Sequence, residues 1–116
     1  MSIGNSAIKW GKAWTHVNVD FYMFHYYEWV YQYYPYKTVT PQSLGLTKPT
    51  VLGEYPLTGF TAVGGQPART PEEFSADLWT IGYAGSLAWA YNDPGFPWSA
   101  TALTGFPAQH ACETQY

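Results

Sequence analysis

Charged residues are scarce in this chain. Only 11% of its 116 residues are Asp, Glu, Lys or Arg, which is less than half of the roughly 25% typical of soluble domains. Five residues are basic and the formal net charge is −3. The sequence therefore lacks the clusters of Lys and Arg that nucleic-acid phosphates require, and we expect no nucleic-acid partner.

Cysteine and long apolar runs are also scarce. The single cysteine, Cys112, excludes a disulfide within the chain and has none of the companions of a metal site. No run approaches the roughly 18 apolar residues that span a bilayer, and no charged-then-apolar leader opens the chain. We expect no membrane partner, no metal and no cofactor.

Aromatic residues are abundant instead. They make up 20% of the chain, with six Trp and eleven Tyr. Aromatic side chains that are not accompanied by clusters of Lys and Arg are suited to binding uncharged ligands, of which sugars are the commonest. Either these side chains line a binding cleft, or part of the surface is covered by another chain or a missing segment.

Strand-like and helix-like segments alternate along the chain. The sequence predicts strands over residues 1–4, 17–27, the apolar pair Val51–Leu52 and 85–91, and helices from Asn5 or Ser6 to about His16, from Thr70 to Gly82, and from Ser99 toward Gln109. The first helix would stack Trp10 on Trp14, one turn apart. The second begins with a Thr cap, a proline at its first position and a capping-box glutamate. Residues 28–47 are expected to form a functional loop with room for one helical turn.

This alternation predicts a parallel sheet with right-handed crossovers. We expect an α/β fold: a single domain, residues 1–116, that forms a parallel (β/α) half-barrel of about four βα units, half of an eight-fold barrel. A half-barrel leaves the edges of its first and last strands and its inner face uncovered.

Polar or reactive residues lie at the end of each predicted strand: Asn5, His25 with Tyr27, Glu54, and Trp89 with Asn92. The carboxyl ends of barrel strands share one rim, where active sites lie. Glu54 is the leading candidate, because Gly53 before it allows close backbone approach and a loop begins after it. The alternatives are a surface glutamate in a turn, a core histidine at His25, and an indole that only fills the barrel at Trp89.

These segments carry a resemblance. In order they read Ser-Ile-Gly-Asn-Ser-Ala, Val-Asp-Phe-Tyr-Met-Phe-His-Tyr-Tyr, Lys-Pro-Thr-Val-Leu-Gly-Glu-Tyr-Pro and Gly-Tyr-Ala-Gly-Ser-Leu-Ala-Trp-Ala-Tyr. Together they resemble strands five to eight of a cellulase- or mannanase-like retaining glycoside hydrolase, which has a TIM-barrel fold.

The resemblance implies a site and a substrate. Glu54 would be the catalytic nucleophile at the end of strand seven. His25 and Tyr27 would contact the sugar and hydrogen-bond that nucleophile, and Trp89 would be the aromatic platform beneath the sugar. The substrate would be an oligo- or polysaccharide. The resemblance also suggests a secreted protein, although this chain has no signal peptide.

One part of the family pattern is missing. The family's acid/base glutamate lies in an Asn-Glu pair, and this sequence contains no such pair. A retaining glycosidase needs two carboxyl groups about 5 Å apart. Glu28 and Asp93 follow strand ends and are the possible substitutes, although a solvated loop charge and a turn former are the simpler interpretations.

Two functions stay open. The chain is a glycoside hydrolase half-barrel whose activity depends on a missing amino-terminal half or is lost, or it is a noncatalytic structural module that self-associates through its aromatic surface. Both interpretations predict a partner, which is either the missing half or further copies of the chain.

Overall fold

The computed structural model describes residues 2–5 and 8–89 of the chain. Its elements are β1 (Ser2–Asn5), the 3-10 helix η1 (Ile8–Trp14), β2 (Phe21–His25), α1 (Glu28–Tyr31), β3 (Thr50–Glu54), α2 (Pro71–Thr80) and β4 (Gly85–Ser86). The expected final helix from Ser99 toward Gln109 lies outside the described residues, as do Asn92, Asp93 and Cys112.

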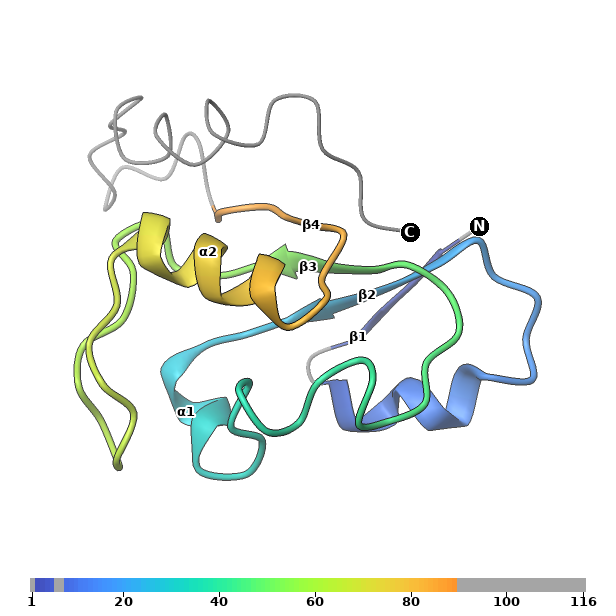
Figure 1. Cartoon of the computed structure of the whole chain (residues 1–116), viewed down its shortest axis with the longest axis horizontal. Coiled ribbons are helices and arrows are strands. Elements are labelled where there is room, and N and C mark those ends of the chain that lie inside the picture. Colours follow the sequence, from blue (N-terminus) through green and yellow to red (C-terminus); the bar gives the residue numbers. More distant parts are fainter. Residues whose placement is uncertain (1, 6–7, 90–116) are drawn as a thin grey trace.

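The strands form one parallel sheet in the order β1-β2-β3-β4 (Figure 1). Tyr22 of β2 pairs with Ile3 on one side and with Thr50 on the other, and Val51 pairs with Gly85. The expected α/β fold with a parallel sheet is therefore confirmed. The last strand has only two residues, and a separate bridge between Pro56 and Trp89 continues the pairing beyond it.

Each strand pairs with its neighbours in sequence, so the sheet is wound in one direction without a reversal. Successive right-handed crossovers of this kind place their connecting segments on one face of a sheet. The core agrees with this arrangement, because one face of the sheet packs against side chains of every described helix. The sheet contributes Tyr22, Phe24 and Leu52, and the helices contribute Ile8, Val30, Phe74 and Leu78. The alternate strand residues Met23, His25 and Val51 are partly exposed.

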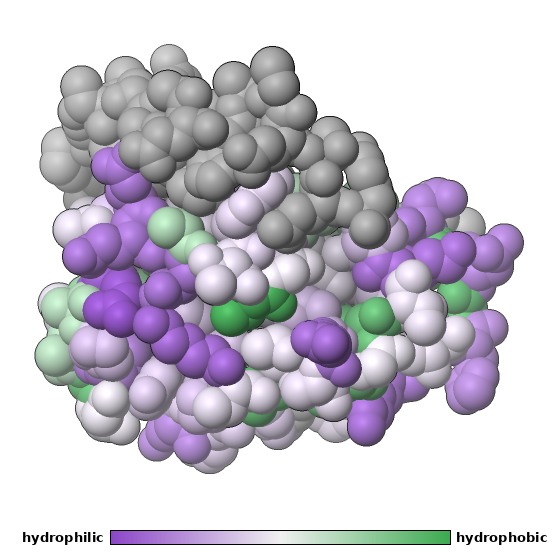
Figure 2. Space-filling view, in the orientation of Figure 1, coloured by the Kyte–Doolittle hydropathy of each residue, from purple (hydrophilic) through white to green (hydrophobic). Residues whose placement is uncertain are grey.

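The described surface on the side shown in Figure 2 is mixed in character. Hydrophobic residues form separate small patches among hydrophilic ones. Within the described residues, no helix is long and apolar enough to cross a membrane.

Helix α2 begins as the sequence predicts. The Thr70 hydroxyl accepts a hydrogen bond from the Glu73 backbone N–H at 3.2 Å, and the Glu73 carboxylate accepts one from the Thr70 N–H at 2.9 Å. This reciprocal capping box satisfies two donors that a helix start leaves without partners. Phe74 and Leu78 are buried, and Gly82 follows the helix with a φ of 92°, a conformation that favours glycine at a helix end.

The first helix differs from its prediction. Residues 8–14 form a 3-10 helix and not an α-helix, and Trp10 is 50% exposed. A 3-10 helix has three residues per turn, so side chains four apart do not align. Gly11 accounts for part of the difference: a Cβ there would lie 3.0 Å from Leu46 and 3.1 Å from Phe24, so the backbone itself packs on the core.

The second strand is shorter than predicted. It begins at Phe21 and not at Val17, because the neighbouring strands β1 and β3 have only four and five residues with which it can pair. The buried Val19 packs into the core from the turn that precedes the strand. The single helical turn expected within residues 28–47 is present as α1.

The long connection between α1 and β3 is attached to α2 through Asp77. Oδ2 of Asp77 accepts hydrogen bonds from the Tyr36 hydroxyl at 2.6 Å and from Nε of Arg69 at 2.8 Å, and Nζ of Lys37 lies 3.1 Å away. Partial burial alone would raise the pKa of Asp77, but the hydrogen bonds from Tyr36, Arg69 and Lys37 outweigh burial and lower the pKa. Asp77 therefore joins two loops and a helix as a carboxylate.

Replacement of Asp77 tests this junction. We expect Asp77→Asn to lower the free energy of unfolding at neutral pH by about 1 to 3 kcal/mol, because charge-assisted hydrogen bonds to Tyr36 and Arg69 are lost. The folded pKa of Asp77 is depressed, so its contribution is present above the unfolded pKa of about 3.9 and is lost as pH falls through the lower folded value. Urea unfolding at a series of pH values measures both effects.

Glu72→Gln is the matched control, since Glu72 lies on the same helix outside this cluster. Its stability should differ from that of the wild type by less than about 0.5 kcal/mol. Equal stability of Asp77→Asn and the wild type at pH 7 would contradict the role of Asp77.

Candidate active site

Three of the side chains predicted from the sequence, those of His25, Tyr27 and Glu54, meet at the carboxyl-terminal edge of the sheet. His25 ends β2, Glu54 ends β3, and the two are paired across the strands. Tyr27 follows β2 by two residues. Parallel strands end at a common edge, which is where ligands bind to α/β sheets.

A shift in the strand register orients Glu54. Phe24 pairs with Leu52, whereas the next residue, His25, pairs with Glu54, so that Gly53 is an extra residue in β3. Without this bulge, strand alternation would place Glu54 on the core face together with Leu52. The extra residue turns Glu54 to the side of His25.

Gly53 is suited to this bulge because it has no side chain. A Cβ at this position would lie 2.5 Å from Cγ and 2.6 Å from Sδ of Met23, closer than packed atoms approach. The close backbone approach that the sequence suggested for Gly53 is therefore present, and its partner is the neighbouring strand.

Two polar side chains contact the same oxygen of Glu54. The Tyr27 hydroxyl donates a hydrogen bond to Oε2 at 3.0 Å, and Nδ1 of His25 lies 3.3 Å from Oε2, slightly beyond a typical hydrogen-bond length. Within the described part of the chain, Oε1 has no such donor. The Glu54 side chain is 24% exposed, so a ligand can reach it.

The pKa of the Tyr27 phenol fits its role as a hydrogen-bond donor. Burial is the main cause that raises the pKa of Tyr27 to about 12, followed by the hydrogen bond to Glu54, the charge of Glu54 and the charge of Glu28. The phenol therefore stays protonated at neutral pH and donates a hydrogen bond to the carboxylate.

Trp89 lies at the same edge through its backbone. Its N–H donates to the carbonyl of Tyr55 at 2.9 Å, and its carbonyl accepts from the N–H of Leu57 at 3.3 Å. The indole is 52% exposed, so it is free to stack on a ligand. The described contacts join Trp89 to the segment after Glu54 but include none between the indole and the carboxylate.

Glu28, one of the two possible second carboxylates, begins α1 directly after Tyr27. Its charge helps to raise the pKa of Tyr27, so the two side chains are close. Glu28, Trp29, Gln32, Val63 and Gly64 line a pocket of about 400 Å³. The sequence did not identify this pocket, because its two walls are far apart along the chain.

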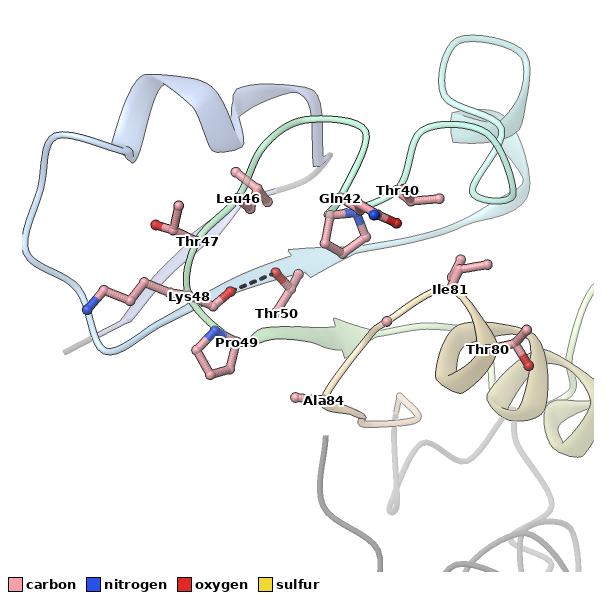
Figure 3. Close-up of a pocket in the computed structure, with 12 residues that line it drawn as sticks. Thr40, Gln42, Leu46, Thr47, Lys48, Pro49, Thr50, Thr80, Ile81 and Ala84 are labelled. Carbon is pink, nitrogen blue, oxygen red and sulfur yellow. Dashed lines mark hydrogen bonds between the residues drawn. The ribbon is translucent and has the colours of Figure 1, made fainter. Parts of the chain in front are cut away.

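A larger pocket of about 1170 Å³ lies at the opposite edge of the sheet (Figure 3). Its walls come from residues 40–50, from Thr80 at the end of α2, and from Ile81 and Ala84 after that helix. Thr50 lines it at the start of β3, about 13 Å along the strand from Glu54 at 3.3 Å per residue. Active sites of parallel α/β folds lie at the other edge, so we locate the candidate site at Glu54 despite the greater volume here.

The described residues contain no group of three or more His, Cys, Asp or Glu side chains that could hold a metal ion. Comparison of the chain with protein-family models, with curated proteins and with solved structures gave no match. The interpretation of the site therefore depends on its own geometry.

Replacement of Glu54 tests the contact with Tyr27. We expect Glu54→Gln to lower the pKa of Tyr27 from about 12, because the anionic acceptor is lost. The pKa should remain above the ordinary value of about 10, because burial is unchanged. Carbon-13 NMR of labelled tyrosine follows the titration. A Tyr27 pKa that is the same in the variant and the wild type would show that the hydrogen bond is absent, and Glu72→Gln serves as the distant control.

Proposed function

We propose that this chain is the carboxyl-terminal half-barrel of a retaining glycoside hydrolase that acts on β-linked oligo- or polysaccharides. The observation that carries the proposal is the environment of Glu54, whose Oε2 is contacted by Tyr27 and His25. A carboxylate held through one oxygen can attack through the other.

The order of the strands supports the half-barrel. A sheet in which each strand lies between its sequence neighbours is typical of barrels, whereas doubly wound sheets reverse their order. The face with Met23, His25 and Val51 would be the interior of the complete barrel. This face is partly exposed in the described chain.

The residues then have distinct roles. Oε1 of Glu54 attacks the anomeric carbon, and a glycosyl ester forms as the bond to the leaving group breaks. Tyr27 and His25 fix the carboxylate through Oε2, so that Oε1 faces the substrate. Trp89 offers its exposed indole to a sugar face.

The proposed half-barrel lacks the acid/base carboxyl group, which must come from another part of the enzyme. A natural glycoside has a poor leaving group, which must receive a proton from a second carboxyl group. In the family that the chain resembles, that group lies on strand four. We assign it to the missing amino-terminal half. Glu28 would take this role only if the chain alone hydrolysed natural substrates.

A noncatalytic, self-associating module is the second candidate. In the described sheet, β1 and β4 each pair on one side only. Free strand edges of this kind add further strands or copies unless they are protected. The low charge of the chain offers little protection.

A substrate that needs no acid separates these functions. A 2-deoxy-2-fluoroglycosyl fluoride carries fluoride, a leaving group that departs without protonation. Glu54 forms a bond to C1 as the C1–F bond breaks, and fluoride leaves with the electron pair. We expect peptide mass spectrometry to find one glycosyl ester at Glu54, while the same chain leaves natural β-glucans and β-mannans intact because it lacks the proton donor.

Two variants control this experiment. Glu54→Gln should abolish labelling, and Glu28→Gln should be labelled like the wild type. Absence of the ester in wild-type protein, or an ester on Glu28, would contradict the assignment of Glu54 as the nucleophile.

A further inference from the structure

The pocket between α1 and the turn at residues 63–66 has a preformed wall. The N–H of Val63 donates to the carbonyl of Gln66 at 3.2 Å, and the reverse bond is 2.9 Å. Gly64 and Gly65 connect them with φ values of 55° and 89°. A two-residue turn with positive φ at both central positions is the tight hairpin form that needs glycine.

A hydrogen bond holds this turn against α1. The hydroxyl of Tyr31 donates to the carbonyl of Gly65 at 3.3 Å. Residues 28–32 and 63–65 are thus attached to each other across more than thirty positions of sequence, and the pocket between them needs no rearrangement to exist.

The lining combines an aromatic face with polar groups. Trp29 is 58% exposed and Val63 is 47% exposed. Glu28 and Gln32 line the same pocket and supply carboxylate and amide groups, while Nε2 of Gln32 bonds the Trp29 carbonyl at 3.3 Å. The described lining residues include no Lys or Arg, so the pocket is unsuited to anions. An apolar ring face with hydrogen-bonding hydroxyls around it, as in a sugar, matches this lining.

The pocket also lies beside the candidate active site. Trp29 follows Tyr27 by two residues, so their Cα atoms are at most about 7 Å apart. Tyr27 hydrogen-bonds Glu54. A chain of sugars bound at Glu54 therefore has a short path to Trp29.

We infer that Trp29, with Glu28 and Gln32, forms an outer subsite that binds a sugar unit of a longer oligosaccharide. The inference builds on the proposed function, and it adds that the substrate is a polysaccharide or long oligosaccharide, not a disaccharide. Trp29 is a specificity-determining residue at this subsite, away from the reacting atoms.

Calorimetric titration tests the subsite with β-1,4-linked gluco- and manno-oligosaccharides, each as disaccharide and hexasaccharide. We expect Trp29→Ala to weaken hexasaccharide binding about five- to tenfold, the value of one aromatic stacking contact, and to leave disaccharide binding unchanged. Trp29→Phe should retain most of the affinity because it keeps a ring. Trp89→Ala should weaken binding of both lengths.

Tyr33→Ala is the matched control, because Tyr33 is an aromatic residue on the same connection that is 63% exposed. Its binding should equal that of the wild type. If Trp29→Ala binds the hexasaccharide as tightly as the wild type does, the subsite assignment is wrong. The proposed function would still stand in that case, provided that the fluoroglycoside labels Glu54. Failure of the wild type to bind any of these sugars would overturn the subsite, and absence of the Glu54 ester as well would overturn both.

Discussion

The irregular pairing of β2 with β3 at Gly53 sets the orientation of Glu54 at the candidate site. The extra residue in β3 turns Glu54 away from the core and pairs it with His25. A Cβ at this position would lie 2.5 Å from Cγ of Met23, so any larger residue would require the Met23 side chain to move. The hydrogen bond from Tyr27, the contact with His25 and the opening toward a ligand all depend on this one irregularity in an otherwise regular parallel sheet.

The helices and loops on the core face of the sheet hold that edge in place. Phe74 of α2 packs against the rings of Tyr26, Tyr36, Tyr55 and Phe60, so the segments that follow β2 and β3 share one aromatic core. Asp77 then attaches the long connection and the loop before α2 to the same helix. The chain thus uses its aromatic residues in two ways, buried behind the sheet and exposed at the edge as Trp29 and Trp89.

Local signals in the sequence predicted local features well. Thr70, Pro71 and Glu73 defined the start of α2, since capping depends on residues within one turn. The strand before Glu54 and the α/β class followed from short apolar runs between helices. The resemblance to a retaining glycoside hydrolase predicted that His25 and Tyr27 contact Glu54. Features that depend on distant contacts were missed or wrong: the 3-10 form of residues 8–14, the shorter β2, the Asp77 junction and the Trp29 pocket each need a partner far away in the sequence.

A crystal structure of the Glu54→Gln chain with a bound β-linked oligosaccharide tests the central claim most directly. The account predicts an anomeric carbon within about 3.5 Å of the residue 54 side chain, the distance of a near-attack geometry, with a sugar face against Trp89. A sugar bound instead in the larger groove between residues 40–50 and the end of α2, with none at residue 54, would contradict it.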